Sequence, residues 1–193
     1  MMLSIQNLCF SYGKKDVLTD FFLSVQTGEI VAVMGDSGCG KTTLLRLIAG
    51  LQKPKSGNID CHAERISYVF QEPRLFPWMT VAENLRAVLT EREDSDEIIR
   101  DALNTVGLAV NADSYPDELS GGMKIRASLA RALAFGGDLF LLDEPFSALN
   151  EELRLALATD LRHAFKEKGI TAILVTHQLS DAEILADRIV KMK

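Results

Sequence analysis

The chain has 193 residues, of which 47% are hydrophobic and 25% charged, and it carries a formal net charge of −6. These values are typical of one compact globular domain with a substantial core, and the acidic balance argues against bulk binding of nucleic acid. No apolar run reaches the roughly 20 residues that a membrane-spanning helix needs, and the three cysteines form no C-x-x-C pair that would favour a zinc site.

The N-terminal segment "LSIQNLCFSY" (3–12) predicts a β-strand, and "SGNIDCHAERISYVF" (56–70) has the same character. We expect these segments to form an antiparallel β-subdomain beside the core. Tyr12 ends the first segment and is placed to stack on a nucleobase, although an aromatic residue in a strand more often belongs to the core. The first residues lack the basic flank and apolar centre of a signal peptide, which predicts a cytoplasmic protein.

Three short, continuous apolar runs follow at 29–35, 139–145 and 171–177. They are too short for buried helices and too apolar for half-exposed strands, so they predict central strands of a sheet that is covered on both faces. Helical periodicity separates them and is clearest at 150–169, where apolar side chains recur every four residues. Strands that alternate with helices predict an α/β fold with a parallel core sheet.

The stretch "GDSGCGKT" (35–42) matches the pattern G-x-x-x-x-G-K-[ST] between a predicted strand and a predicted helix. The glycines let backbone N–H groups point at phosphates, Lys41 supplies a positive charge, and the Thr42 hydroxyl can reach Mg²⁺. Cys39 is expected to be an inert small residue, although a helix N-terminus can also activate a thiol. The predicted nucleotide ligands of this stretch are Gly35, Asp36, Ser37, Gly38, Cys39, Gly40, Lys41, Thr42 and Thr43.

Residues 73–133 show helical periodicity, and we expect a helical subdomain there, inserted between two parts of the core at 1–72 and 134–193 of a single domain. Near its end lies "ELSGGMKIRASLARAL" (118–133), where a serine and a glycine pair open a helix. The N–H groups at such a helix end attract an anion. Ser120, Gly121 and Gly122 therefore form a second candidate phosphate site.

Acidic residues end the second apolar run, "LFLLDEP". A magnesium ion between phosphates favours a carboxylate at the end of an adjacent strand, and Asp143 provides one. Glu144 is expected to point the other way along the extended chain and to act as a general base on a water molecule that attacks the γ-phosphate. Surface acids at a strand end are the alternative interpretation of both residues.

Two further polar residues end predicted strands. His177 ends the third apolar run, where it can hydrogen-bond the γ-phosphate or orient the attacking water, or serve only as a turn residue. Gln71 follows the strand-like run "ISYVFQ", and its amide can reach Mg²⁺ or the water. Position alone leaves both roles undecided.

Along its whole length the chain resembles the ATP-binding subunit of ATP-binding cassette (ABC) transporters. The matching motifs are "GDSGCGKTT" as Walker A, "YVFQEP" as the Q-loop, "LSGGM" as the signature, "LFLLDEP" as Walker B, "SALN" as the D-loop and "VTH" as the switch histidine. The resemblance implies a P-loop NTPase (RecA-like) fold with a parallel core sheet flanked by helices, an antiparallel β-subdomain and a helical insertion. The sequence of residues 71–85 is similar to that of importer subunits of the nitrate, sulfonate and taurine type.

The resemblance also implies an activity, ATP hydrolysis coupled to solute import, with ATP and Mg²⁺ as cofactors. It assigns adenine stacking to Tyr12, γ-phosphate and metal sensing to Gln71, and the switch role to His177. In the family the signature of one subunit, here Ser120, Gly121 and Gly122, closes over the ATP of a second subunit, which we expect to be identical.

The further implied partners are an integral membrane permease and, indirectly, a solute-binding protein, without nucleic acid. The protein is then expected on the inner face of the cell membrane. Phe76, Pro77 and Trp78 form the expected docking surface for the permease, and core packing of these residues is the alternative. ATP-driven closing and opening of the dimer would move the permease.

The chain departs from the family pattern at several points. Met123 and Ile125 replace glutamines that are common in the signature region, and Asn150 replaces the aspartate that usually ends the D-loop. The sequence ends at "DRIVKMK", before the distal strands and C-terminal helices that often follow, so we expect no regulatory C-terminal domain in this chain.

Two other functions compete with transport. One is an ABC ATPase that works without transport, as an ATP-switched binding or regulatory module on an envelope complex. The other is a P-loop kinase, which would have no use for the signature residues.

Overall fold

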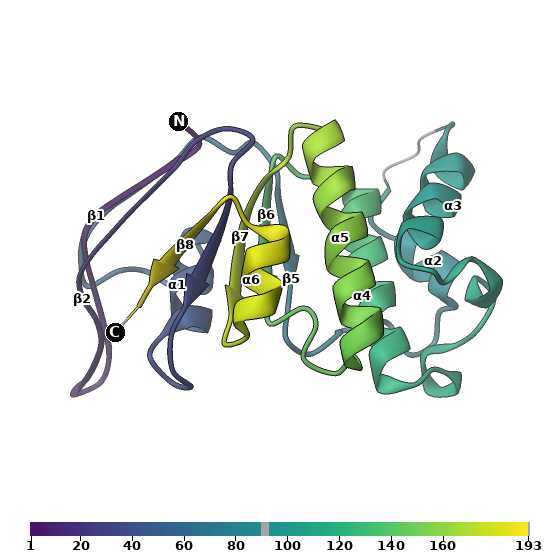
Figure 1. Cartoon of the computed structure of the whole chain (residues 1–193), viewed down its shortest axis with the longest axis horizontal. Coiled ribbons are helices and arrows are strands. Elements are labelled where there is room, and N and C mark those ends of the chain that lie inside the picture. The colour runs from purple at the N-terminus through teal and green to yellow at the C-terminus, as the bar shows by residue number, and fades with distance from the viewer. Residues whose placement is uncertain (90–92, 193) are drawn as a thin grey trace.

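A computed structural model describes residues 1–89 and 93–192. Residues 90–92, which belong to the expected helical subdomain, and residue 193 lie outside the described residues. The described chain forms two sheets, with a group of helices beyond the larger one (Figure 1). The division into a core and a helical subdomain stays a prediction.

The larger sheet is parallel and has the strand order β5-β6-β7-β3-β8 in the part of the chain that is described. Its strands are β3 (Ile30–Met34), β5 (Ile66–Val69), β6 (Leu139–Asp143), β7 (Thr171–Thr176) and β8 (Arg188–Lys191). The three apolar runs are thus confirmed as the central strands β3, β6 and β7. Strand β8 was not predicted, because its four-residue span contains only two apolar residues.

The central strands are apolar throughout because both faces of the sheet are covered. Ile30 and Ala32 of β3 lie in a core with α5 (Glu151–Glu167), α6 (Leu179–Leu185) and the helical insertion, whereas Val31 and Val33 lie in a second core with α1 (Lys41–Ile48) and the antiparallel strands. Successive side chains of a strand point to opposite faces. Each run therefore contributes to two cores at once.

The smaller sheet is antiparallel, with the order β2-β1-β4, and comprises β1 (Leu3–Tyr12), β2 (Lys15–Val25) and β4 (Ser56–Cys61). This confirms the expected β-subdomain but corrects one of its segments. Within 56–70, only the first half joins the antiparallel sheet, since Ile66–Val69 pairs in parallel with β6. The four residues of this strand, Ile-Ser-Tyr-Val, carry no signal of pairing direction, which depends on the partner strand.

The helical insertion contains α2 (Val81–Arg86), α3 (Ser95–Thr105), two 3₁₀ turns at Ala109–Asn111 and Pro116–Glu118, and α4 (Gly121–Phe135). Thr80 caps α2 through a reciprocal pair of hydrogen bonds with Glu83. Helix α4 contacts both α3 and the parallel strand β5, so it connects the insertion to the core. No helix within the described ranges is long and apolar enough to cross a membrane.

Candidate functional site

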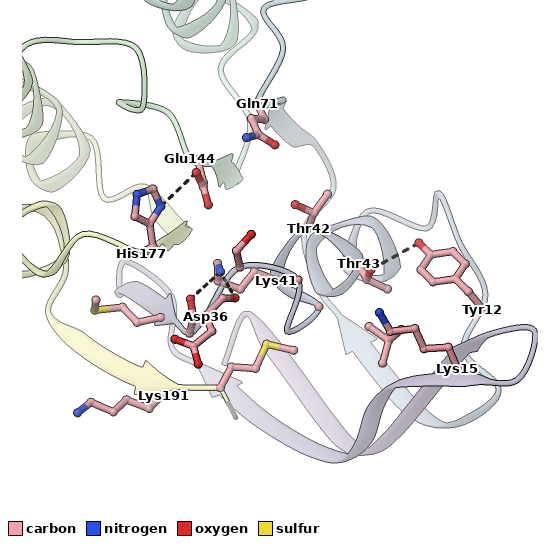
Figure 2. A pocket seen from close by; sticks show the side chains of 17 residues that line it. Tyr12, Lys15, Asp36, Lys41, Thr42, Thr43, Gln71, Glu144, His177 and Lys191 are labelled. Atoms are coloured by element: carbon pink, nitrogen blue, oxygen red, sulfur yellow. Dashed lines mark hydrogen bonds and ion pairs between the residues drawn. The ribbon is translucent and has the colours of Figure 1, made fainter.

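A cavity of about 1180 Å³ opens where the parallel strands end at their carboxyl edge (Figure 2). Ligands of open parallel sheets bind at this edge. The cavity is lined by twelve of the predicted site residues: Tyr12, Gly35, Asp36, Ser37, Gly38, Gly40, Lys41, Thr42, Thr43, Gln71, Glu144 and His177. In Figure 2, Glu144 and His177 lie at one end and Tyr12 and Thr43 at the other, with Lys41 between them.

The phosphate loop connects β3 to α1 by a tight turn. Gly38 and Gly40 have φ angles of 80° and 106°, which are strained for any residue with a side chain. Lys41 begins α1 and is buried, and its Nζ donates to the carbonyl oxygens of Gly35 and Asp36 at 2.7 and 2.8 Å. The loop therefore holds the ammonium group against its own backbone, at the place where the pattern expects phosphates.

Cys39 is the one predicted ligand of this loop that does not line the cavity among the described residues. Its side chain is half-buried and turns toward Lys41, with Sγ 4.0 Å from Nζ. Its thiol therefore faces the interior of the loop rather than the cavity.

Asp143 and Thr42 meet under the cavity. The Thr42 hydroxyl donates to Asp143 Oδ1 at 2.9 Å, and the Tyr68 hydroxyl lies 3.4 Å from Oδ2. Asp143 is 2% exposed, and this burial raises the pKa of its carboxyl above the ordinary value. Burial beside Asp143 also raises the pKa of the Tyr68 hydroxyl.

The Thr42 and Asp143 pair fits a magnesium ion. Both residues offer hard oxygen ligands, and a buried carboxylate gains from a nearby cation. No group of three or more His, Cys, Asp or Glu side chains able to hold a metal occurs in residues 1–89 and 93–192. Mg²⁺ is commonly held by one or two protein oxygens together with phosphate oxygens, so a site completed by the nucleotide is the arrangement that this pair suits.

Glu144 differs from the expectation of an extended chain. Strand β6 ends at Asp143, and Glu144 has a φ of 46°, in the left-handed region that a residue with a side chain rarely adopts. Its N–H donates to the carbonyl of Val175 on β7 at 3.0 Å. This bond to the neighbouring strand holds the turn, and the carboxylate lines the cavity. The expectation that an extended chain orients Glu144 is therefore wrong.

His177 lies next to Glu144, as the two parallel strands require. Its Nδ1 is 3.3 Å from Glu144 Oε2, and the imidazole is 53% exposed whereas the carboxylate is 20% exposed. A half-exposed imidazole beside a half-buried carboxylate can change its contacts when a ligand enters. The prediction that His177 lies at the same edge as Gly35 and Asp143 is confirmed.

Gln71 and Tyr12 line opposite parts of the cavity (Figure 2). Gln71 comes two positions after β5 and is exposed. The Tyr12 ring is 47% exposed and meets Phe10 edge-on, with the ring centroids 4.9 Å apart. The alternative of a core residue is therefore wrong for Tyr12.

The signature residues lie elsewhere. Within the described chain, Ser120, Gly121 and Gly122 do not line the cavity. Ser120 caps α4 by accepting a hydrogen bond from the Met123 N–H at 3.3 Å. A Cβ on Gly121 would meet nothing within 4 Å, whereas one on Gly122 would approach Leu149 to 2.9 Å. The helix end is thus open to an outside ligand at Gly121 and closed by the D-loop at Gly122.

The surface that follows the Q-loop is exposed. Phe76 and Trp78 are 38% and 69% exposed, with ring centroids 5.7 Å apart. Buried Asn84 holds the segment, accepting from the Phe76 N–H at 2.7 Å and donating to the Phe76 and Met79 carbonyls at 3.1 Å. Core packing of these two rings, the alternative interpretation, is therefore wrong.

Some residues of the cavity wall were not predicted from the sequence. Lys15 and Lys191 line it, from the start of β2 and the end of β8. Lys15 follows Tyr12 by three positions, so a hairpin prediction at Gly13 would have placed both on one side of the cavity. Lys191 had no such signal, because β8 itself was not recognised.

Comparisons with known proteins agree with this geometry. The model of the ABC transporter family matches residues 18–147, more than half of the chain. The chain is 44% identical, over 187 residues, to the aliphatic sulfonates import ATP-binding protein SsuB 1 of Mesorhizobium japonicum, covering 93% of this chain and 71% of that protein. It is 42% identical to the nitrate import ATP-binding protein NrtC of Synechococcus elongatus, covering 93% of this chain but 29% of the relative. The sulfate/thiosulfate import ATP-binding protein CysA of Pseudomonas aeruginosa is also 42% identical, with 100% and 64% covered.

Solved structures resemble the chain in the same way. A dimeric structure of the ATP-binding cassette MJ0796 in a post-hydrolysis state, bound to ADP and Pi, superposes with a TM-score of 0.89 at 28% identity. It covers 100% of this chain and 94% of that one. A further dimeric structure of MJ0796, described as a bacterial ABC transporter cassette, gives a TM-score of 0.90. The predicted fold is thereby confirmed.

Proposed function

This chain belongs to the ABC transporter family as an ATP-hydrolysing cassette, and from that premise we propose that it energises solute import through a separate membrane permease. The observation that carries the proposal is the convergence of Lys41, Glu144 and His177 on one cavity at the carboxyl edge of the parallel sheet. The named relatives import sulfonates, nitrate and sulfate, which favours a small oxyanion as the solute.

The residues of the cavity suit the hydrolysis of a phosphoanhydride. Lys41 and the loop N–H groups are placed to bind the phosphates, and the exposed Tyr12 ring to stack on adenine. Glu144 is proposed to accept the proton of the water whose oxygen forms the new bond to the γ-phosphorus, as the bond to the β-phosphate oxygen breaks. His177 would orient Glu144, and Gln71 would contact the γ-phosphate side of the cavity.

Thr42 and Asp143 are proposed to hold Mg²⁺ together with the phosphates, with Gln71 as a further ligand. The ion would supply charge neutralisation on the transferred phosphoryl group. The protein's own part is to keep the Thr42 hydroxyl 2.9 Å from the buried Asp143 carboxylate.

The signature is proposed to complete the site of a second, identical subunit. The helix end at Ser120 offers backbone donors that no group of the described cavity uses, and Gly121 is open to an approaching ligand. The γ-phosphate of the partner's ATP fits this end, since a helix N-terminus favours negative charge. ATP would then join the two subunits, and its hydrolysis would release them.

The permease is proposed to dock on the exposed surface of Phe76, Pro77 and Trp78. Aromatic rings that stand out from a rigid segment are typical anchors of protein interfaces. Arg131 of α4 donates to the Pro73 carbonyl at 3.3 Å, which links this surface to the signature helix. The protein would thereby lie on the inner face of the membrane, with a solute-binding protein on the other side.

The experiment that tests the composite site mixes two inactive variants. Lys41→Ala removes the positive charge that is proposed to bind the phosphates in the phosphate loop. Gly121→Asp adds a carboxylate at the open end of the signature helix without a steric clash. Because an acid suits the first turn of a helix, Gly121→Asp leaves the fold intact. Each variant alone is expected to lose ATP hydrolysis, and the mixture to regain part of it, since a heterodimer contains one intact composite site.

The matched control replaces Gly121 by Asn, which has the same shape without the charge and should retain more activity than Gly121→Asp. If the mixture stays inactive while mixed subunits demonstrably form dimers, a trans site is wrong. If ATP hydrolysis never responds to a membrane partner, the result favours the binding or regulatory module over transport.

A further inference from the structure

Behind the cavity lies a buried polar cluster that the proposed chemistry does not use. It consists of Arg154 on α5, Asp181 on α6 and Thr176 at the end of β7, with exposed fractions of 8%, 3% and 3%. None of the three lines the cavity of the described chain. Charged side chains are rarely this buried unless they have a defined partner.

The cluster is connected from end to end. Arg154 Nη1 lies 3.4 Å from Asp181 Oδ1, and the Thr176 hydroxyl donates to Asp181 Oδ2 at 3.3 Å. The same hydroxyl accepts from the Gln178 N–H at 3.0 Å. The hydroxyl of Thr176 thus joins the residues on both sides of His177, and it fixes the turn from which the imidazole reaches Glu144.

The other end of the cluster leads to the D-loop. Arg154 lies on the first turn of α5, and its N–H donates to the carbonyl of Asn150 at 3.0 Å. Asn150 also caps the helix by accepting from the Leu153 N–H at 2.9 Å. Beside it, Leu149 blocks the space next to Gly122 of the signature. A displacement of the D-loop would therefore move the start of α5 and the guanidinium with it.

The energetics do not favour a purely stabilising role for this ion pair. Burying two charges costs hydration that an ion pair with imperfect hydrogen bonds often does not fully regain. Within residues 1–89 and 93–192, Arg154 Nε and Asp181 Oδ1 are both buried without a hydrogen-bond partner. Buried polar atoms that lack a hydrogen bond call for an explanation.

We propose that Arg154, Asp181 and Thr176 form a positioning cluster that holds His177 against Glu144 and couples it to the D-loop. In this proposal Arg154 moves together with the D-loop, and its ion pair with Asp181 carries that movement from α5 to α6. Thr176, which is bonded to Asp181, fixes the backbone on either side of His177. The two helices lie side by side in front of the sheet in Figure 1. The inference rests on the proposed ATPase roles of Glu144 and His177.

The test measures steady-state ATP hydrolysis of Asp181→Asn and Thr176→Val, with nucleotide affinity measured separately. Both substitutions keep the shape of the side chain and remove the charge or the hydroxyl. We expect kcat to fall on the order of tenfold, as for coupled residues in contact, with unchanged ATP affinity. A cluster that only stabilises the fold would instead lower the melting temperature and leave kcat per folded molecule unchanged, which would overturn the proposal.

A double variant separates an effect on kcat from an effect on folding. Arg154→Met combined with Asp181→Leu replaces the ion pair by apolar side chains of similar size, an exchange that proteins often tolerate without loss of stability. It should fold and show the same loss of kcat. A folded double variant with wild-type kcat would contradict the proposal.

Arg162 provides a matched control. It lies two turns further along α5 and contacts the same part of the chain, donating to the Leu185 carbonyl at 2.6 Å and to Asp187 at 3.1 Å. Arg162→Gln therefore weakens the contact of α5 with the end of α6 without touching the cluster, and kcat should stay unchanged. An equal loss in this control would show that helix contact alone matters and overturn the proposal.

The route through His177 is tested by combining Asp181→Asn with His177→Ala. If the cluster acts through the imidazole, Asp181→Asn causes no further loss once His177 is gone. A full additional loss in that background would overturn the inference and leave the proposed function intact. Unchanged hydrolysis in His177→Ala alone would instead contradict the proposed role of His177, and the inference with it.

Discussion

The Glu144 carboxylate lies 3.3 Å from Nδ1 of His177, and the two residues come from the ends of neighbouring parallel strands. A bond from the Glu144 N–H to the Val175 carbonyl fixes this geometry, because it holds Glu144 in a left-handed turn. The candidate base and its partner are therefore positioned by the backbone of β7, not by flexible loops.

Replacing Glu144 by Gln is expected to reduce kcat by ~10² to 10⁴, the usual contribution of a general base. ATP binding should persist, so the variant should accumulate as an ATP-bound dimer in size-exclusion chromatography. Glu167→Gln, at the exposed end of α5, is the matched control and should behave like the wild type. A Glu144→Gln protein that hydrolyses ATP normally would contradict the assignment.

Replacing Lys41 by Ala is expected to abolish tight nucleotide binding. The substitution removes the charge that faces the phosphates and leaves the carbonyls of Gly35 and Asp36 without their donor. Titration calorimetry with ATP measures the effect, and Lys53→Ala, at an exposed position after α1, serves as the control. Retained micromolar affinity in Lys41→Ala would count against the phosphate-loop interpretation.

Replacing Asp143 by Asn is expected to stabilise the nucleotide-free protein at neutral pH. Burial raises the pKa of this carboxyl in the folded state, so the wild type loses stability as pH rises from the pKa of the unfolded chain through the folded pKa. The variant has no carboxyl group to ionise and so does not lose this stability. Each kcal/mol gained in the free energy of unfolding raises the melting temperature by about 2–4 °C.

The same variant should lose the extra stabilisation that Mg²⁺ adds to ATP, because a neutral amide is a weaker ligand than a carboxylate. Thermal melts at several pH values, with and without Mg²⁺ and ATP, measure both effects. Asp160→Asn, an exposed position on α5, is the control. A variant whose melting temperature still rises with Mg²⁺ as much as the wild type's would remove Asp143 from the metal site.

Replacing Trp78 by Ala is expected to weaken permease association on the order of 30-fold, the effect of a typical interface anchor. Basal ATP hydrolysis should stay unchanged, because Trp78 lies outside the cavity lining of the described chain. Hydrolysis with and without the cognate permease in proteoliposomes measures the difference. Val110→Ala, at a residue that is 95% exposed on a 3₁₀ turn, is the control, and equal effects of both variants would reject Trp78 as the anchor.

Features that depend on local pattern could be predicted from the amino-acid sequence. Continuous apolar runs identified β3, β6 and β7, because a strand covered on both faces has no polar side to show. The glycine spacing before Lys41 identified the phosphate loop, since positive φ angles and a helix start restrict which residues fit there. Asp143 and His177 followed, because parallel strands end at a common edge.

Features that depend on partners distant in the chain became visible in the folded structure. It assigned Ile66–Val69 to the parallel sheet and added β8, whose four residues carry too little pattern to predict. It replaced the extended Glu144 by a left-handed turn that β7 holds. It also brought Arg154 to Asp181 behind His177. The physical reason is common to all: hydrogen bonds and ion pairs between distant segments depend on how the chain is folded, and local side-chain periodicity does not encode them.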